Sequence, residues 1–336
     1  MKRIRNFVGR MMFVGVSFLA LAMGPETSRA QTVRADAVFA EAARAESARD
    51  DAGLEESARD EAGLEEPLLI GDTWTEPFRG VRHLHRVTTN PNQNIHALAI
   101  DLCESGISFR ATKYEERGQT TSAFGASMRA QAAINGDFFV SGFGLERGFA
   151  IGGGALWPAG KPDDASTGQL AIGAHRLEIL RDLGIRKPEA WMTDVVGGRP
   201  TVLVDGTIPD TSGHAVLCQR NPRTAVGLTK DGSTLLVAVV DGRATSRVGM
   251  TCNELGELML RLGADDALNL DGGGSATMWL QGQGVLNYPT DGRERKVANH
   301  LAIFARGDGP ASACPRVYRE DADGLSLRTP PNLVAP

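Results

Sequence analysis

From about residue 72 the chain alternates between short apolar runs and glycine-containing turns, and this alternation restricts its fold more than any other feature. Apolar runs bounded by Gly, Asn, Asp or Ser are typical of β-strands. The 40 glycines suit such turns, because glycine adopts backbone conformations that other residues avoid. The pattern predicts strands at residues 96–102, 107–112, 132–135, 169–173, 177–180, 201–204, 224–229, 235–241, 267–271, 276–280 and 297–304.

Helical patterns interrupt these runs at two places. Residues 121–129 form the first. The second begins at a capping box of Thr251 and Glu254, continues with apolar residues at helical spacing, and ends at Gly263. We also expect residues 96–102 and 107–112 to pair as a hairpin. The fold class is therefore predicted as α+β, with a mixed or antiparallel sheet core and few helices in a single large domain.

The first 30 residues have the three parts of a secretory signal peptide. Basic residues including Arg3 and Arg5 precede an apolar run at 11–23, and Ser28 and Ala30 mark a cleavage site. The run has 13 residues, whereas a membrane-spanning helix needs about 20. We therefore expect cleavage after residue 30, no stable membrane anchor afterwards, and a periplasmic or secreted protein of the bacterial type.

Composition divides the remaining chain into three parts. Residues 31–71 are of low complexity, carry a ten-residue unit twice at 46–65, and are predicted to be a solvated spacer. Residues 72–307 form the predicted domain, and residues 308–336 a loosely ordered C-terminal tail. The net charge of −5 and the absence of a basic patch argue against nucleic acid as a partner.

Four cysteines are present, and an even number in an exported protein is typical of disulfides. None stands in a C-x-x-C pair, which argues against a zinc site. Three pairings exist for four cysteines. We favour Cys218–Cys252, because these two bracket strands that belong to the candidate site, and this choice leaves Cys103–Cys314.

The segment Asn269-Leu-Asp-Gly-Gly-Gly-Ser275 is the most informative for function. The backbone N–H groups of Gly272, Gly273, Gly274 and Ser275 would have little side chain around them, and such a turn can form an anion-binding nest. The segment lacks the Gly-Lys-Ser/Thr of a nucleotide-binding loop. A merely structural glycine hairpin is the alternative, but Asn269, Asp271 and Ser275 around the glycines favour a site.

Two further segments place charged residues at strand ends. Arg223 begins the predicted strand at 224–229, and Asp241 and Arg243 follow the next strand. Arginine suits phosphate because its planar fork bonds two oxygens at once. For a single arginine a surface ion pair is the commoner role, but two on neighbouring strands near a glycine nest favour anion binding.

Two segments supply polar candidates. Asn135 and Asp137 end a strand and precede Phe138 and Phe139, where they could bind a sugar hydroxyl or orient water. Near the last strand, Asn299 follows the basic residues Arg295 and Lys296, which could face an anionic substrate.

Taken in order, these motifs resemble the phosphodiester glycosidase family over roughly residues 80–306. The resemblance implies a catalytic domain of mixed α/β fold. It also implies hydrolysis of the bond between sugar C1 and oxygen in a glycosyl-1-phosphodiester, of N-acetylglucosamine type, within a sugar-phosphate or phosphorylated glycan. The site would bind phosphate through Arg223, Arg243 and the glycine turn, and Asn135, Asn269 and Asn299 would also bind substrate. Phosphate is a good leaving group, so the site must chiefly stabilise the growing charge.

A carboxylate must also activate water or stabilise C1. Asp271 and Asp241 are the first candidates for this carboxylate, and Asp137 is the next. The sequence requires no cofactor. These aspartates could hold a divalent cation, but no calcium-binding Asp-x-Asp-x-Asp spacing supports one.

Two other functions remain open on sequence grounds. A phosphodiesterase that cuts P–O would commonly use metals held by His and Asp clusters. Among the six histidines, only His83 and His85 have ligand-like spacing, far from the glycine turn. A non-catalytic module that binds phosphorylated polysaccharide would use the same arginines and glycines without cleavage.

Overall fold

The computed structural model describes residues 73–158, 167–181 and 187–309, together with Cys314 and the backbone of two strands at 317–321 and 324–328. The predicted signal peptide and spacer lie outside these described residues. None of the described helices is long and apolar enough to cross a membrane.

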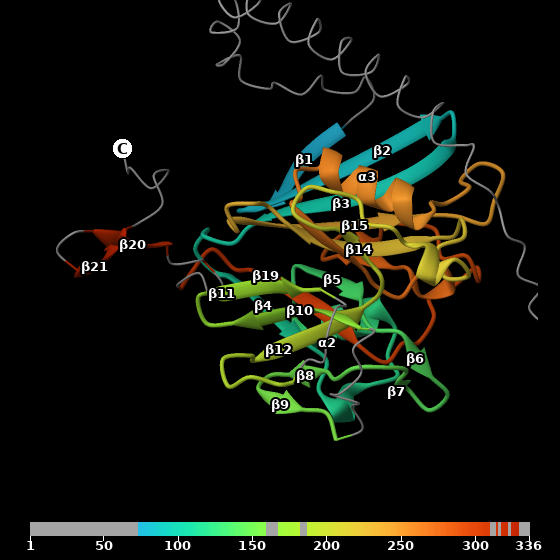
Figure 1. Ribbon diagram of the computed structural model, residues 1–336. Coiled ribbons are helices and arrows are strands. Elements are labelled where there is room, and N and C mark those ends of the chain that lie inside the picture. The colour runs from blue at the N-terminus through green and yellow to red at the C-terminus, as the bar shows by residue number, and fades with distance from the viewer. Residues whose placement is uncertain are drawn as a thin grey trace, which may run out of the picture. The chain divides into compact units, whose positions relative to one another are not determined.

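A seven-stranded sheet forms the largest layer (Figure 1). In spatial order its strands are β1 (Thr73–Phe78), β2 (Val81–Thr89), β3 (Asn92–Asp101), β15 (Thr234–Val240), β14 (Arg223–Leu228), β16 (Asp266–Asn269) and β13 (Thr201–Leu203).

Two five-stranded sheets lie against one face of this layer. The first contains, in spatial order, β11 (Arg176–Leu180), β10 (Gly168–Gly173), β12 (Asp194–Gly198), β8 (Ile151–Gly152) and β9 (Ala155–Leu156). The second contains β18 (Gly284–Val285), β17 (Met278–Leu280), β5 (Ala132–Asn135), β19 (His300–Ala305) and β4 (Ile107–Ala111). Two small pairs are β6 (Phe139–Val140) with β7 (Gly144–Leu145), and β20 (Val317–Asp321) with β21 (Gly324–Arg328).

Every strand pairing in the described residues is antiparallel. This architecture, with its few helices, confirms the predicted α+β class in its antiparallel form. The predicted hairpin of residues 96–102 with 107–112 is wrong. β3 already has β2 and β15 on its two edges, and β4 pairs instead with β19 in another sheet.

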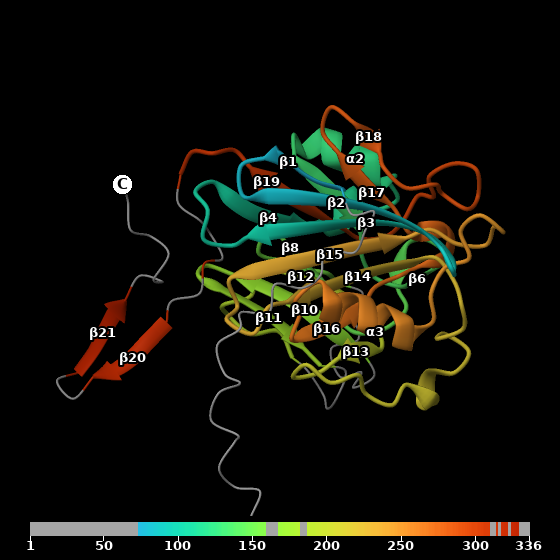
Figure 2. The ribbon, with the colours of Figure 1, turned by 90° about the horizontal axis from the view of Figure 1, so that it is seen from above.

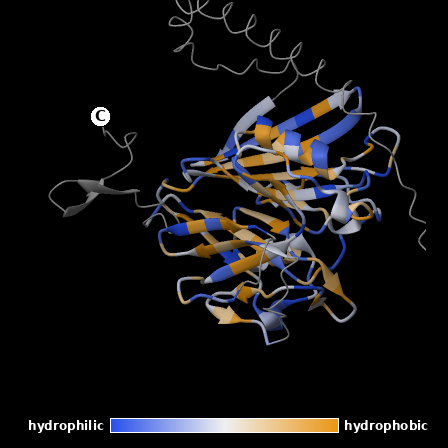
Figure 3. Ribbon diagram, in the orientation of Figure 1, coloured by the Kyte–Doolittle hydropathy of each residue, from blue (hydrophilic) through white to orange (hydrophobic). Residues whose placement is uncertain are grey.

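The core lies between the three sheets because side chains alternate between the two faces of each strand. On β15, Val237 and Val239 belong to the cluster shared by all three sheets, whereas Leu236 and Ala238 belong to a second cluster with α3 (Cys252–Arg261). Hydrophobic residues accordingly follow the strands, while many loop residues are hydrophilic (Figure 3). The central strands of the seven-stranded sheet, such as β15, are thus buried on both faces, whereas β1 is largely exposed.

Each α-helix covers the outer face of one sheet (Figures 1 and 2). α3 begins at the predicted capping box, in which the Thr251 hydroxyl accepts from the Glu254 N–H and Glu254 reaches back to the Thr251 N–H. α2 (Thr121–Met128) places Phe124 against Ala302 and Phe304 of β19. Both helices were predicted from sequence. Three single turns of 3-10 helix are η1 (Tyr114–Glu116), η2 (Ser212–His214) and η3 (Gly273–Ser275).

Both predicted disulfides are present. Cys218 bonds to Cys252 at the start of α3, and Cys103 bonds to Cys314. β20 and β21 pair as a hairpin within the segment that the sequence assigns to a loosely ordered C-terminal tail. The limits predicted for the domain stay a prediction.

Candidate active site

The ends of three strands lie side by side along one end of the seven-stranded sheet, because neighbouring strands run in opposite directions. In β14, Arg223 pairs with Val240 of β15, and Ala225 pairs with Asn269 of β16. The beginning of β14 therefore lies beside the last residues of β15 and β16. The chain continues from these strand ends to Asp241 and Asp271, so residues far apart in sequence lie close together at one end of the sheet.

Asn135, the last residue of β5 in a neighbouring sheet, connects that strand to this end of the seven-stranded sheet. Its side chain is fully buried, and its amide nitrogen donates to the backbone carbonyl of Asp271 at 2.6 Å. Its amide oxygen accepts from the Thr224 hydroxyl at 2.8 Å and from the Thr277 backbone N–H at 3.0 Å. Asn135 therefore fixes both ends of the glycine turn instead of lining the cavity beside it.

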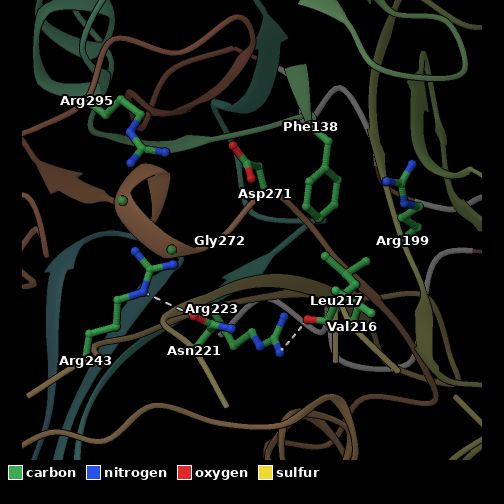
Figure 4. A pocket seen from close by; sticks show the side chains of 12 residues that line it. Phe138, Arg199, Val216, Leu217, Asn221, Arg223, Arg243, Asp271, Gly272 and Arg295 are labelled. Atoms are coloured by element: carbon green, nitrogen blue, oxygen red, sulfur yellow. Dashed lines mark hydrogen bonds between the residues drawn. The ribbon is translucent and has the colours of Figure 1, made fainter. Parts of the chain in front are cut away.

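A pocket of about 500 Å³ opens beside the glycine turn (Figure 4). Its wall combines arginines, one carboxylate and a few apolar side chains. The lining residues are Phe138, Arg199, Val216, Leu217, Asn221, Arg223, Arg243, Asp271, Gly272, Gly273, Gly274 and Arg295. Arg199 pairs with Glu146 and Arg295 with Asp291, so Arg223 and Arg243 against Asp271 leave one net positive charge, and the pocket favours an anionic ligand.

Asp271 is the carboxylate of this pocket and is partly exposed to it. Burial raises the pKa of Asp271 to about 6. Hydrogen bonds from the Ser275 side chain and the Gly272 backbone, and the nearby charge of Arg295, favour the ionised form. Such a group can exchange a proton near neutral pH.

Asp137 lies close enough to Asp271 for the two charges to interact. It is 3% exposed and accepts from the Gly197 N–H at 2.8 Å and from the Asn299 amide at 2.6 Å. Burial raises the pKa of Asp137 to about 7, and the charge of Asp271 adds to the effect. A small cavity next to the main pocket is lined by Asp137 and by Thr167, whose buried hydroxyl has no partner within the described structure.

Asp241 is held differently and does not line the pocket. It is 1% exposed, and its two carboxylate oxygens accept from the Asn94 amide at 2.6 Å, the Tyr288 N–H at 2.9 Å and the Asn287 amide at 3.3 Å. Burial raises the pKa of Asp241 above its ordinary value. All of its polar contacts join strands and loops of the protein, which is the pattern of a structural carboxylate.

Arg223 and Arg243 both line the pocket, but they differ in how many hydrogen bonds they make within the protein. Arg223 is 2% exposed and donates to the backbone carbonyls of Met250 at 2.9 Å, of Leu217 at 3.0 Å and of Gln219. Burial lowers the pKa of Arg223 to about 10. Arg243 is exposed, donates to the Asn221 amide oxygen at 3.1 Å, and places its guanidinium beside Gly273.

The glycine turn has fewer N–H groups for a ligand than the sequence suggests. The N–H of Gly273 donates to the Pro222 carbonyl and that of Ser275 to the Gly272 carbonyl, each at 3.0 Å. The Gly272 N–H bonds to the carboxylate of Asp271. The lack of side chains matters mainly for access, because a Cβ at Gly273 would lie 3.0 Å from the Arg243 guanidinium.

Two buried asparagines support the site from behind. Asn269 is fully buried and donates to the backbone carbonyl of Arg199 at 2.7 Å, and its own amide oxygen has no partner among the described residues. Asn299 is also fully buried, and besides holding Asp137 it accepts from the Thr112 and His300 N–H groups. Neither side chain lines the main pocket.

The pocket also contains residues that the sequence analysis did not select. Arg199 lies over the ring of Phe138, with 5.2 Å from its guanidinium carbon to the ring centre, and donates to Glu146 at 2.8 Å. Val216 and Leu217 come from the loop that the Cys218–Cys252 disulfide fixes. The position of Arg199 directly after Gly197 and Gly198 was the available signal, but the strand β12 before it was missed.

One cluster of carboxylates in the described residues has the spacing of a metal site. Oxygen atoms of Asp205, Asp265 and Asp266 lie within 4.8 Å of one another. Arg181 already donates to Asp205 and Asp266, and none of these side chains lines the pocket. The cluster is therefore separate from the candidate active site, and no such group in the described residues includes Asp137, Asp241 or Asp271.

Comparisons with known proteins agree with the resemblance seen in the motifs. The profile of the family described as phosphodiester glycosidase matches residues 128–304, which is more than half of the chain. The matched range contains all of the candidate catalytic and substrate-binding residues from Asn135 to Asn299.

Curated relatives match over shorter stretches. N-acetylglucosamine-1-phosphodiester alpha-N-acetylglucosaminidase of Bos taurus is 29% identical over 174 residues, covering 47% of this chain and 32% of that protein. The SPbeta prophage-derived uncharacterized protein YomE of Bacillus subtilis is 39% identical over 110 residues, covering 33% of this chain and 16% of that protein. The matches thus span about a third or less of these relatives' own length.

Two solved structures share the fold. A hypothetical protein from Synechocystis superposes with a TM-score of 0.52 at 16% identity, covering 70% of this chain and 64% of that chain. The zebrafish N-acetylglucosamine-1-phosphodiester alpha-N-acetylglucosaminidase catalytic domain, auto-inhibited by its pro-peptide, gives a TM-score of 0.50 at 20% identity, covering 67% and 82%.

Proposed function

This chain belongs to the phosphodiester glycosidase family, and from that premise we propose that it hydrolyses the C1–O bond of a glycosyl-1-phosphodiester. The family supports a glycosidase-type hydrolase acting on sugars linked through phosphodiesters. We take N-acetylglucosamine as the first sugar to test, because the Bos taurus relative carries it in its name. The substrate would be a sugar-phosphate or a phosphorylated glycan.

The observation that carries this proposal is a titratable carboxylate in an arginine-lined pocket. Asp271, with its pKa raised to about 6, faces the same cavity as Arg223 and Arg243. Among the described residues, neither of these arginines has a carboxylate within ion-pair distance. Their charge is therefore available to a ligand, in contrast to Arg295, which pairs with Asp291.

The proposed chemistry follows from where charge develops. Water forms a bond to C1 while the bond from C1 to the phosphate oxygen breaks, and that oxygen keeps the electron pair. The singly charged diester becomes a more negative monoester, so cations placed at its oxygens stabilise the transition state. Arg243 and the partly committed Arg223 would supply them, and the water proton would pass to a carboxylate.

Asp271 is the proposed catalytic carboxylate. It would accept the proton from water or stabilise positive charge at C1. Asp137, which lies beside it with a pKa near 7, is the second proposed carboxylate of the site. Asn135 is proposed as a positioning residue, because it bonds to the backbone of Asp271. Phe138 would pack beneath the sugar ring.

We also propose that the protein works outside the cytoplasm, in the periplasm or after secretion. Its two disulfides support this, because disulfides persist in oxidising compartments. The signal-peptide pattern of residues 1–30 gives the same expectation.

The test is release of N-acetylglucosamine from UDP-N-acetylglucosamine and from a simple N-acetylglucosamine-1-phosphodiester by purified residues 31–336. Wild type and Glu257→Gln, which removes an exposed carboxylate on α3, should both release sugar. Asp271→Asn should not. Tight binding of a panel of sugar-1-phosphodiesters without turnover by wild type would favour the binding module and overturn the hydrolase.

A further inference from the structure

A second cavity, of about 490 Å³, lies directly beside the candidate active site. The two cavities share Arg199, Val216 and Leu217. The second adds Arg147, Ser212 and His214. Each cavity is large enough for a sugar or a phosphate group, since small-molecule pockets start near 300 Å³.

The chemistry of the second cavity is that of an anion site. Arg147 and Arg199 bring two permanent positive charges, and the His214 ring can donate a hydrogen bond, whereas the Ser212 hydroxyl already donates to Asp210 at 2.9 Å. Glu146 takes up part of Arg199 through one hydrogen bond at 2.8 Å. Arg147 also lines the small cavity of Asp137, and Arg199 lines all three cavities.

The wall between the cavities is a fixed part of the protein. Arg223 donates to the Leu217 carbonyl at 3.0 Å, and the disulfide at Cys218 follows directly. Val216 is 84% exposed and lines both cavities. Phe138 and Val216 therefore form an apolar bridge between two cationic ends.

The order of groups along the bridge gives the direction of a bound substrate. Arg243 lies beside Gly273 at one end, and Arg199 lies over Phe138 at the other. In Figure 4, Asp271 and Phe138 lie between the end with Arg243 and Gly272 and the end with Arg199. A scissile phosphate at the Arg243 end puts C1 near Asp271, and the sugar ring then extends over Phe138 toward Arg199 and Arg147.

We infer that the second cavity binds a further phosphate on the sugar itself, on the side away from C1. This inference rests on the proposed function. The substrate class is then a sugar with phosphates on both sides, as in a chain of sugars joined by phosphodiesters. Arg147 and His214 determine the preference for that class, and the residues around Asp271 carry out the cleavage.

The test measures binding and needs no turnover. Isothermal titration of wild type should give N-acetylglucosamine 1,6-bisphosphate an affinity about tenfold higher than N-acetylglucosamine 1-phosphate, which corresponds to one charge-assisted contact. Arg147→Gln should reduce the ratio to within about twofold and leave the 1-phosphate affinity unchanged. His214→Asn should reduce the ratio in the same direction. Arg261→Gln, which removes an exposed arginine of α3, should keep the wild-type ratio.

Two results would overturn the inference. Equal affinities of wild type for the two sugars would show that no second phosphate is bound. A contribution of Arg147 to UDP-N-acetylglucosamine and not to the 1,6-bisphosphate would place the second anion on the leaving-group side. Absence of turnover with any phosphodiester would count against the proposed function alone, because the 1-phosphate and the 1,6-bisphosphate, whose affinities are compared, are phosphate monoesters that need not be cleaved.

Discussion

The ends of β15 and β16 look alike in sequence and differ in the structure. Each strand runs into an aspartate followed by glycine, Asp241-Gly242 and Asp271-Gly272. Asp241 accepts from two amides and one backbone N–H, and it does not line the pocket beside the glycine turn. Asp271 bonds to groups of its own turn and faces a cavity with four arginines.

The difference shows what separates a structural from a reactive buried carboxylate. Burial raises the pKa of both groups, so the pKa direction does not distinguish them. What distinguishes them is where the remaining lone pairs point. Those of Asp241 are used by distant strands and loops, whereas Asp271 keeps a side open to a ligand. We therefore expect substitutions at the two positions to affect different measurements.

The largest expected effect is on turnover. Asp271→Asn should reduce kcat by about 10²–10⁴-fold, because it removes a proton-accepting group while keeping the shape of the side chain. Its melting temperature should stay at or above that of wild type, since the buried charge is lost. Enzyme assays combined with calorimetry check both. A variant with wild-type kcat would remove Asp271 from the chemistry.

The reverse is expected at Asp241. Asp241→Asn places an amide N–H₂ group against donors from Asn94, Asn287 and Tyr288, which should lower the free energy of unfolding by about 1–3 kcal/mol. At temperatures where the variant is folded, kcat should stay within a few-fold of wild type. Urea unfolding and kcat at low temperature check this. A stable variant without activity would mean that Asp241 belongs to the reaction.

A similar contrast is expected between the two arginines. Arg243→Gln should raise KM about tenfold with unchanged stability, because its guanidinium faces the pocket and donates to a single acceptor among the described residues. Arg223→Gln should lower both stability and activity, because it also releases the carbonyls of Leu217 and Met250. Melting curves and KM of the two variants separate these roles. Equal loss of stability in both would contradict the contrast.

The smallest expected effect is on the pH dependence of stability. The folded-state pKa values of Asp137 and Asp271 are raised to about 7 and about 6, so their contribution to stability is fully present below pH 4 and is lost as pH rises to about 7. Asp137→Asn should therefore lose less stability than wild type between pH 5 and pH 8 in urea unfolding. The same slope in both proteins would mean that Asp137 has an ordinary pKa.

Much of the fold could be predicted because it is encoded locally. The apolar spacing identified strands such as β10 and β15, and the capping box placed the start of α3. β12 was not predicted as a strand, because glycines make up its last two residues. The hairpin between β3 and β4 was wrong because pairing depends on which edges other strands occupy, and the partner of β3 on one side, β15, lies over 130 residues away.

The sequence selected several residues that lie close together in the structure, but it did not give the contacts that each of them makes. Of the selected residues, Arg223, Arg243 and Asp271 line the pocket, Asp137 lines the small cavity beside it, and Asp241 lines neither. The roles given to them stay predictions. The roles depend on contacts such as that of Asn94 with Asp241, which are 147 residues apart in sequence. Arg199 was missed because its role comes from the ring of Phe138 beneath it and from Glu146 beside it.

Hydrolysis in oxygen-18 water tests the central claim most directly. Wild-type protein would be incubated with an N-acetylglucosamine-1-phosphodiester, and both products would be analysed by mass spectrometry. Cleavage of C1–O at the Asp271 pocket predicts the label in the sugar and none in the phosphate monoester. Label in the phosphate would mean attack at phosphorus, and it would contradict the proposed roles of Asp271 and of the arginines around it.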